Sequence, residues 1–181
     1  MGALPFFHVF ANTALLNHAM ATGASIAMVP RFETKQVLAT IQKYRCTGFP
    51  GVPTMFQAML DHPDLAKTDL SSLKVAIHAA APCPVDVKHA MITWWGPVIF
   101  EYYSATEGAG FTAISPQEWL ARPGSVGKSI LGEIRVLDDD GNRLGPNEVG
   151  RIFFHGGGSF SYHNDPEKTA SVMGEHGATF G

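Results

Sequence analysis

Hydrophobic and polar positions follow two different periods along the first two-thirds of the chain. Val37 and Leu38 lie four and three positions before Ile41, and Tyr44 lies three after it, which predicts a helix with one apolar face over residues 33–44. Further helices are predicted over residues 12–21, 54–60 and 85–94. Short apolar runs predict buried strands at residues 25–29, 46–49, 73–78 and 98–102. This repeated spacing predicts an α/β fold, with a parallel sheet flanked by helices over residues 1–112.

The pattern changes after Tyr103. Residues 133–137 alternate like a half-buried strand, and Asp-Asp-Gly-Asn at 139–142 is a turn signal. Residues 149–154 predict the returning strand, and residues 165–172 predict a short helix. We therefore expect residues 113–181 to form a smaller, mostly antiparallel β portion of the same large domain.

Composition narrows the class of protein. With 181 residues, of which 45% are hydrophobic and 16% charged, the chain is long enough to bury a core. The net charge of −3 argues against a broad basic surface, so we expect no nucleic-acid partner. The two cysteines, Cys46 and Cys83, form no CxxC pair, which argues against a disulfide scaffold or zinc ribbon and favours a reducing, cytoplasmic location.

The first thirty residues contain no Asp, Glu, Lys or Arg. Polar residues such as His8 and Asn12 interrupt them, so we expect no transmembrane segment. Such an uncharged start is typical of the inside of a globular protein. We therefore expect the chain to be a piece of a longer one.

Two glycine motifs are weak signals. Gly-Lys-Ser at 127–129 lacks the earlier glycine of a phosphate loop, because Arg122 occupies that position, and a surface turn is favoured. His-Gly-Gly-Gly at 155–158 resembles the oxyanion loop of lipases, but no G-x-S-x-G elbow occurs. A flexible exit from a strand is favoured there, and a serine hydrolase remains a lesser alternative.

Two predicted strand ends carry the most informative residues. Residues 102–108 (Tyr-Tyr-Ser-Ala-Thr-Glu-Gly) offer aromatic rings, a hydroxyl at Thr106 and a carboxylate at Glu107, which together suit a nucleotide with Mg²⁺. Residues 79–82 (Ala-Ala-Ala-Pro) offer a wall of small side chains. The non-functional alternatives are a helix-capping loop, tight helix–strand packing and, for His8, a buried histidine bonded to the backbone.

In their order along the chain, these motifs resemble the adenylate-forming superfamily, which includes acyl-CoA and aryl-CoA synthetases, luciferases and nonribosomal peptide synthetase adenylation domains. Residues 5–11 (Pro-Phe-Phe-His-Val-Phe-Ala) match its Pro-x-x-His segment. Residues 79–82 match Gly-Gly-Ala-Pro with Ala for both glycines, and residues 103–107 match Tyr-Gly-x-Thr-Glu with Ser for Gly. Weaker matches to further family elements lie at residues 124–128, 150–152 and 162–169.

The resemblance implies that parts of the family's domain are missing. Its Lys-containing phosphate loop would lie upstream, and its small C-terminal domain with a catalytic Lys would lie downstream. Thr179, Phe180 and Gly181 resemble the start of the family's Thr-Gly-Asp motif, with Phe180 in place of its Thr. The chain is therefore expected to be an internal fragment of the large N-terminal domain.

The resemblance also implies roles for particular residues, with ATP, Mg²⁺ and coenzyme A as the small molecules. Tyr103 would stack on adenine, Thr106 would donate to the α-phosphate and Glu107 would coordinate Mg²⁺. The implied nucleotide-binding residues are Ala79, Ala80, Ala81, Pro82, Glu101, Tyr102, Tyr103, Ser104 and Thr106. The implied catalytic residues are His8, Thr106 and Glu107, and those implied to contact the acid are Phe7, His8, Phe10 and Ala79.

These roles imply that the parent protein is an ATP-dependent acyl-CoA synthetase acting on a fatty or aryl carboxylic acid, with a homodimer as one possible state. We expect the fragment to be inactive alone. The alternative is a non-catalytic module that binds a nucleotide or a partner, and a lesser one is a peptide synthetase adenylation domain. The Gly-to-Ala and Gly-to-Ser changes put the size of the acyl pocket in doubt, not the nucleotide chemistry.

Overall fold

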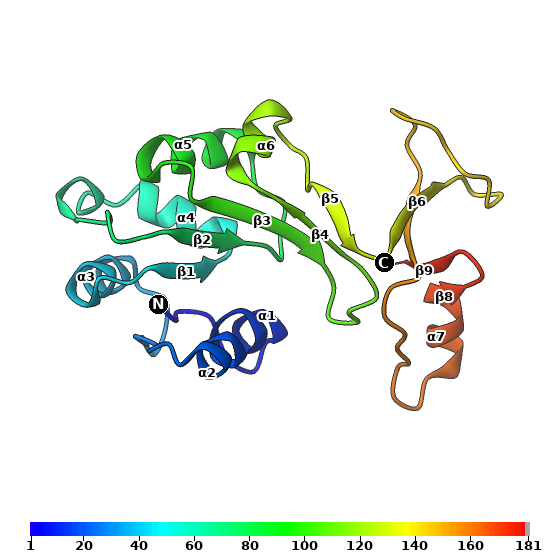
Figure 1. Cartoon of the computed structure of the whole chain (residues 1–181), viewed down its shortest axis with the longest axis horizontal. Coiled ribbons are helices and arrows are strands. Elements are labelled where there is room, and N and C mark those ends of the chain that lie inside the picture. The colour runs from blue at the N-terminus through cyan, green and yellow to red at the C-terminus, as the bar shows by residue number, and fades with distance from the viewer. Residues whose placement is uncertain (180–181) are drawn as a thin grey trace. The chain divides into compact units, whose positions relative to one another are not determined.

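The structure is a computed structural model that describes residues 1–179 (Figure 1). It contains two compact units. Unit 1 comprises Met1–Tyr102 and Ile114–Val126. Unit 2 comprises Tyr103–Ala113 and the described residues from Gly127 onward.

Parallel strands form the centre of unit 1. Strand β1 (Gly48–Gly51) pairs with β2 (Val75–His78), and β2 pairs with β3 (Ile99–Ser104), in both cases parallel. The sheet is mixed, because its order β1-β2-β3-β4-β5 ends in the antiparallel pair β4 (Phe111–Ile114) and β5 (Lys128–Leu131). The predicted parallel sheet flanked by helices is confirmed.

Helix α3 (Thr34–Tyr44) buries the predicted apolar face except for Tyr44 in its last turn, which is 61% exposed. Val37, Leu38 and Ile41 are buried, while the Glu33 carboxylate accepts the first free backbone N–H groups of the helix. The predicted helices α4 (Pro53–Leu60) and α5 (Val85–Trp95) are also present.

Helix α6 (Pro116–Ala121) was not predicted, although its sequence carries a start signal. Ser115 and Glu118 form a reciprocal capping box around Pro116 at the first turn. The buried indole of Trp119 joins the main core from this helix, so a short segment with little periodicity is fixed by one large side chain.

The N-terminal helical segment confirms the helix predicted over residues 12–21. It consists of α1 (Val9–Ala11), the π-helical turn η1 (Asn12–Asn17) and α2 (His18–Thr22). It stops at Gly23, whose φ of 69° lies in the left-handed region that favours glycine. π-Helical turns are frequent at functional sites, and this one begins four residues after His8.

Two strand predictions need correction. The strand predicted at residues 25–29 is wrong, because this segment makes only an isolated parallel bridge between Met28 and Gly2. Strand β1 runs from Gly48 to Gly51 rather than over residues 46–49, and the pattern misplaced it because Gly-Phe-Pro-Gly has low strand propensity. Pro50 is tolerated there because β1 is an edge strand of the described sheet.

Unit 2 contains a four-stranded antiparallel sheet in the order β6-β7-β9-β8. The predicted strands are β6 (Glu133–Leu137) and β7 (Arg151–His155), and the predicted helix is α7 (Pro166–Val172). The short strands β8 (Met173–Gly174) and β9 (Gly177–Thr179) gave no sequence signal because they are glycine-rich. The small 3₁₀ turn η2 (Leu65–Lys67) lies in unit 1.

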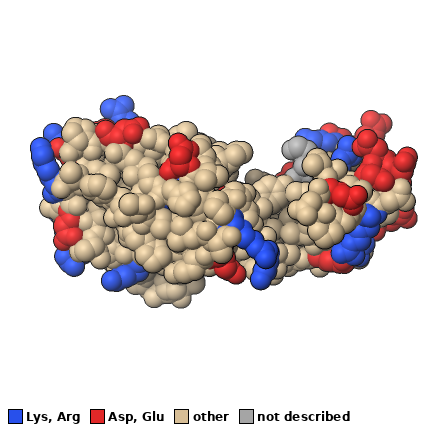
Figure 2. Space-filling model, turned by 90° about the horizontal axis from the view of Figure 1, so that it is seen from above, with Lys and Arg blue, Asp and Glu red and all other residues tan. Residues whose placement is uncertain are grey.

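Charged side chains of both signs occur on the face drawn in Figure 2, with Lys and Arg at several separate places. No helix within residues 1–179 is long and apolar enough to cross a membrane.

The main core of unit 1 is built around Phe56, which is fully buried. Its ring packs edge-on against Phe49 and Trp95, at centroid distances of 5.3 and 5.6 Å. We predict that Phe56→Ala lowers the free energy of unfolding by about 3–5 kcal/mol, since it removes a large apolar side chain and leaves a cavity. Phe7→Ala is the matched control, because Phe7 is 94% exposed and should change stability by less than about 0.5 kcal/mol. Chemical denaturation measures both free energies of unfolding. Equal losses in the two variants would contradict the central place of Phe56 in the core.

Candidate functional site

The turn after β2 presents small side chains to solvent. Ala79 is buried, whereas Ala80, Ala81 and Pro82 are exposed. Ala80 has a φ of 72°, in the left-handed region that disfavours a residue with a β-carbon. It occupies the second glycine position of the Gly-Gly-Ala-Pro motif, so the sharp turn is kept here at a cost in backbone strain.

The Pro-x-x-His segment turns directly into the first helix. The Nδ1 atom of His8 accepts the backbone N–H of Phe10 at 3.1 Å, so His8 caps α1. His8 is exposed, and the alternative of a buried histidine is therefore wrong. Phe7 is also exposed, whereas Phe10 is buried. The segment thus places an imidazole and a phenyl ring at the surface of unit 1.

Three predicted residues of unit 1 share one small buried cluster. Phe10 and Ala79 belong to its interior, and Tyr102 packs against it. The rings of Phe10 and Tyr102 meet edge to face at 5.3 Å, and burial raises the pKa of the Tyr102 phenol to about 12. The fold therefore brings the Pro-x-x-His segment, the alanine turn and the end of β3 together.

The Glu101 carboxylate lies inside unit 1. It is paired with Lys88 of α5, and the His78 ring at the end of β2 lies 3.4 Å away. All three side chains are buried. The expected contact of Glu101 with adenine stays a prediction, and the observed partners of its carboxylate come from the protein.

In unit 2, residues 104–110 form a closed loop. The Ser104 hydroxyl donates to the Gly110 carbonyl at 2.7 Å, and the Gly108 N–H donates to the Ala105 carbonyl at 3.0 Å. Ser104, which stands for the family's glycine, therefore closes the base of the loop. Thr106 is exposed at the tip.

Glu107 is held by a residue far away in the chain. The Tyr162 hydroxyl donates to its carboxylate at 2.7 Å across 55 positions of sequence. This hydrogen bond raises the pKa of the Tyr162 phenol, because losing the phenol proton would remove the bond beside a carboxylate. Tyr162 belongs to the weak match at 162–169, and sequence reasoning gave it no role.

The loop at residues 104–110 also packs closely against β7 and the glycines that follow this strand. The Tyr103 ring stacks on Phe154 of β7, with centroids 6.2 Å apart and planes at 28°. A β-carbon at Gly110 would overlap the Phe154 ring, and one at Gly157 would overlap the Ala109 carbonyl. Gly157 and Gly158 therefore allow close backbone approach to the loop, which explains these two glycines without an oxyanion hole. Sequence reasoning missed this role.

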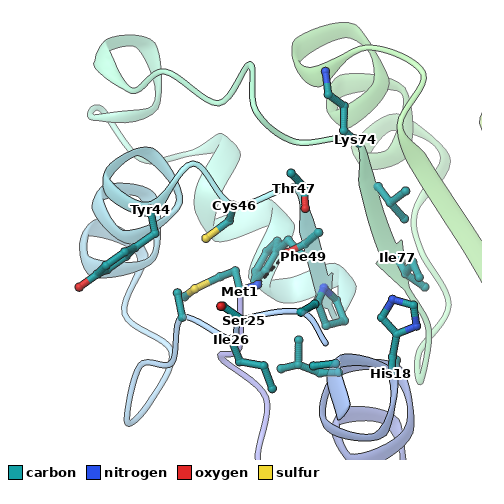
Figure 3. A pocket seen from close by; sticks show the side chains of 18 of the residues that line it. Met1, His18, Ser25, Ile26, Tyr44, Cys46, Thr47, Phe49, Lys74 and Ile77 are labelled. Carbon is teal, nitrogen blue, oxygen red and sulfur yellow. Dashed lines mark hydrogen bonds between the residues drawn. The ribbon is translucent and has the colours of Figure 1, made fainter. Parts of the chain in front are cut away.

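A cavity of about 1160 Å³ lies beside β1 (Figure 3). It is lined by residues of unit 1 between Met1 and Ile77, including Phe49 and the labelled His18. None of the predicted site residues lines it. The cavity and the predicted nucleotide-binding residues are therefore separate features.

A magnesium ion bound with a nucleotide needs few protein ligands, commonly one or two carboxylates in addition to phosphate oxygens. Within residues 1–179, no group of three or more His, Cys, Asp or Glu side chains could hold a metal ion. Glu107 offers one carboxylate, of which Oε1 accepts the Tyr162 hydroxyl, and its expected role toward Mg²⁺ stays a prediction. Phe180 and Gly181, matched to the start of the Thr-Gly-Asp motif, lie outside the described residues.

The family of AMP-binding enzymes matches residues 1–162. The chain belongs to this family.

Several curated relatives are CoA ligases. A long-chain-fatty-acid–CoA ligase of Bacillus subtilis is 32% identical over 96% of this chain and 31% of its own length. The 4-coumarate–CoA ligase 2 of Oryza sativa subsp. japonica is also 32% identical, over 96% of this chain and 32% of its own length. The chain thus spans about a third of the length of these relatives.

Several solved structures have a fold similar to that of this chain. The amide bond synthetase McbA from Marinactinospora thermotolerans superposes with a TM-score of 0.85 and 27% identity, covering 97% of this chain and 36% of the other. The anthranilate CoA ligase AuaEII, solved with anthranoyl-AMP, gives 0.82 and 26%, covering 96% and 34%.

We predict that Ala80→Gly raises the free energy of unfolding by up to about 1 kcal/mol. Glycine removes the steric cost of the left-handed backbone, and its larger entropy in the unfolded chain offsets part of the gain. Ala81→Gly is the control and should destabilise, since Ala81 is not among the positive-φ residues. Thermal unfolding measures both, and a loss of stability in Ala80→Gly would contradict the strain at this turn.

A second prediction concerns the Tyr162–Glu107 hydrogen bond. Glu107→Gln should lower the pKa of Tyr162 toward its ordinary value, because the neighbouring negative charge is gone. NMR titration of ring-labelled tyrosine follows this pKa. Glu175→Gln is the control, because the Glu175 side chain is 87% exposed and lies 3.4 Å from His176 Nε2. An unchanged Tyr162 pKa in Glu107→Gln would show that the bond is absent in solution.

Proposed function

We propose that the protein carrying this chain activates a carboxylic acid with ATP, releases pyrophosphate, and transfers the acyl group to coenzyme A. The match of residues 1–162 to the AMP-binding enzyme family carries this proposal. The curated relatives named as CoA ligases support the second step, and their names support a fatty or aryl acid as substrate.

In unit 1, we assign the exposed turn at Ala80, Ala81 and Pro82 to the adenine ring, with Ala79 beneath it. Small side chains allow the flat face of a base to approach the backbone closely. Glu101 and Tyr102 lie in the neighbouring strand β3 and are assigned to the same base. The shared cluster of Ala79 and Tyr102 supports this assignment.

In unit 2, we assign Tyr103 to stacking on adenine, Ser104 to the close approach of the loop, and the Thr106 hydroxyl to the α-phosphate. Glu107 would hold the magnesium ion that accompanies ATP and neutralises phosphate charge. The exposure of Thr106 at the loop tip and the fixed position of the Glu107 carboxylate support these roles.

The acid is assigned to the Pro-x-x-His segment of unit 1. His8 would lie by the carboxylate and the thiol entrance, with Phe7, Phe10 and Ala79 near the acyl chain. Phe7 and His8 are exposed, so a ligand can reach them. Because His8 caps α1 through Nδ1, its Nε2 is the ring atom directed away from the helix backbone.

The chemical difficulty of the first step is the meeting of two anions. A carboxylate oxygen attacks the α-phosphorus, and the bond to the pyrophosphate oxygen breaks. Donors aimed at the phosphate stabilise the charge that develops, and alignment of the two substrates supplies much of the remaining rate. In the second step, a thiol loses its proton, its sulfur attacks the acyl carbon, and AMP leaves.

The other expectations are part of the proposal. We assign residues 1–112 to the α/β part and residues 113–181 to the β-rich part of one large domain. A cytoplasmic location and a homodimer are proposed with the enzyme. The 181 residues alone are proposed to be inactive.

ATP–pyrophosphate exchange by the full-length protein, tested with a panel of fatty and aryl acids, measures the first step. We expect Glu107→Gln to lower the exchange rate by about 10²–10³-fold, since it removes the carboxylate that would hold Mg²⁺, and with it the positive charge that would stabilise the transferred adenylyl group. Glu175→Gln should leave the rate unchanged. Normal exchange by Glu107→Gln would contradict the metal role, and exchange by no acid would contradict the proposed function.

Calorimetry with ATP and Mg²⁺ on the 181 residues addresses the non-catalytic alternative. Measurable binding would support retained adenine contacts, and no binding would favour an inert fragment, whereas turnover would contradict the proposed inactivity. Labelling by a serine-directed phosphonate would favour the hydrolase.

A further inference from the structure

Three buried polar side chains meet behind the ends of two neighbouring strands of unit 1. His78 is the last residue of β2, Glu101 lies in β3, and the two are direct partners in the parallel register. Lys88 reaches them from α5, donating to the Glu101 carboxylate. The His78 Nε2 atom lies 3.4 Å from the same carboxylate oxygen.

His78, Lys88 and Glu101 form a buried triad, in which Lys88 is the ion-pair partner of Glu101. Burial, together with the nearby Lys88 ammonium, lowers the pKa of His78 to about 3, so His78 is neutral at neutral pH. Burial lowers the pKa of Lys88, and its hydrogen bond and ion pair with the Glu101 carboxylate oppose that shift. The Lys88 ammonium also lies 4.9 Å from the centre of the Trp119 ring, which favours the charged form.

Each strand member of the triad stands next to a proposed nucleotide-binding residue. His78 directly precedes Ala79 and the exposed turn, and Glu101 directly precedes Tyr102. A movement of either strand end would therefore move the groups assigned to adenine. The triad lies where these two ends are fixed relative to each other.

A gain in stability alone does not explain why Lys88 and Glu101 form a buried ion pair. Removing two charges from water is costly, and well-packed apolar residues often replace buried ion pairs without loss of stability. The directional bond from a side chain of α5 to β3 does supply a fixed position, which an apolar contact does not. Within residues 1–179, neither ring nitrogen of His78 has a hydrogen-bond partner, so the one strong polar bond of the triad is that of Lys88.

We propose that Lys88 is a positioning residue for nucleotide binding: its bond to Glu101 fixes β3 to α5, so that Tyr102 faces the base beside the alanine turn that follows the paired strand β2. This inference rests on the proposed function. Lys88 itself is assigned no contact with the reacting atoms.

The test is Lys88→Met in the full-length protein, assayed by ATP–pyrophosphate exchange. We expect KM for ATP to rise by about tenfold or more, because small displacements of binding groups have large effects. KM for the acid, and kcat per folded molecule, should stay the same. A merely structural role would lower the folded fraction and leave both KM values unchanged, and that result would overturn the inference. Lys74→Met, which removes an exposed lysine just before β2, is the matched control.

Loss of Lys88 leaves a buried carboxylate unpaired, so the single variant can fail to fold. The double variant Lys88→Met with Glu101→Gln removes both charges and should recover the thermal midpoint. We expect its Kd values for ATP and for GTP, measured by competition, to rise in the same proportion. A wild-type Kd for ATP would overturn the inference. A rise confined to ATP would also overturn it, because the effect would then belong to a direct contact of Glu101 with adenine.

The wild-type protein separates the two proposals. If it catalyses exchange and Lys88→Met keeps the wild-type KM for ATP, the positioning role is wrong and the proposed function stands. If the wild-type protein catalyses no exchange with any acid, the proposed function is wrong, and the positioning role falls with it.

Discussion

Parallel pairing of β2 with β3 is the constraint on which the candidate site in unit 1 depends. Parallel strands end at the same edge of a sheet, so the residues that follow them become neighbours whatever their separation in the chain. The register that places His78 beside Glu101 therefore also brings the alanine turn near Tyr102. The phenyl ring of Phe10 then packs against this edge from the N-terminal helix.

Close backbone approach plays the corresponding part in unit 2. The loop at 104–110 lies against Gly157 and Gly158, where the space for a side chain is taken by backbone atoms of Gly108 and Ala109. Phe154 fills the space over Gly110 and stacks on Tyr103. The loop that carries Thr106 and Glu107 is thus shaped by packing against β7 and its exit, and Tyr162 sets the direction of the Glu107 carboxylate.

Local signals predicted the elements whose formation is a local matter. The apolar face of α3 follows from 3.6-residue periodicity, and the strands β2 and β3 follow from buried runs. The prediction failed at residues 25–29, where an apolar run found no neighbouring strand to extend it beyond one bridge. It also missed the short strands β8 and β9, which are held by pairing with one another and with β7 rather than by their own composition.

The amino-acid sequence by itself determined the order of the family motifs, and with it the class of enzyme and the residue types available for a nucleotide. Only the tertiary structure decided which side chains meet them: Lys88 with Glu101, and Tyr162 with Glu107. Sequence patterns report periodicity over one or two turns or one strand. A contact across 13 or 55 positions depends on how whole elements pack, and no local pattern encodes that distance.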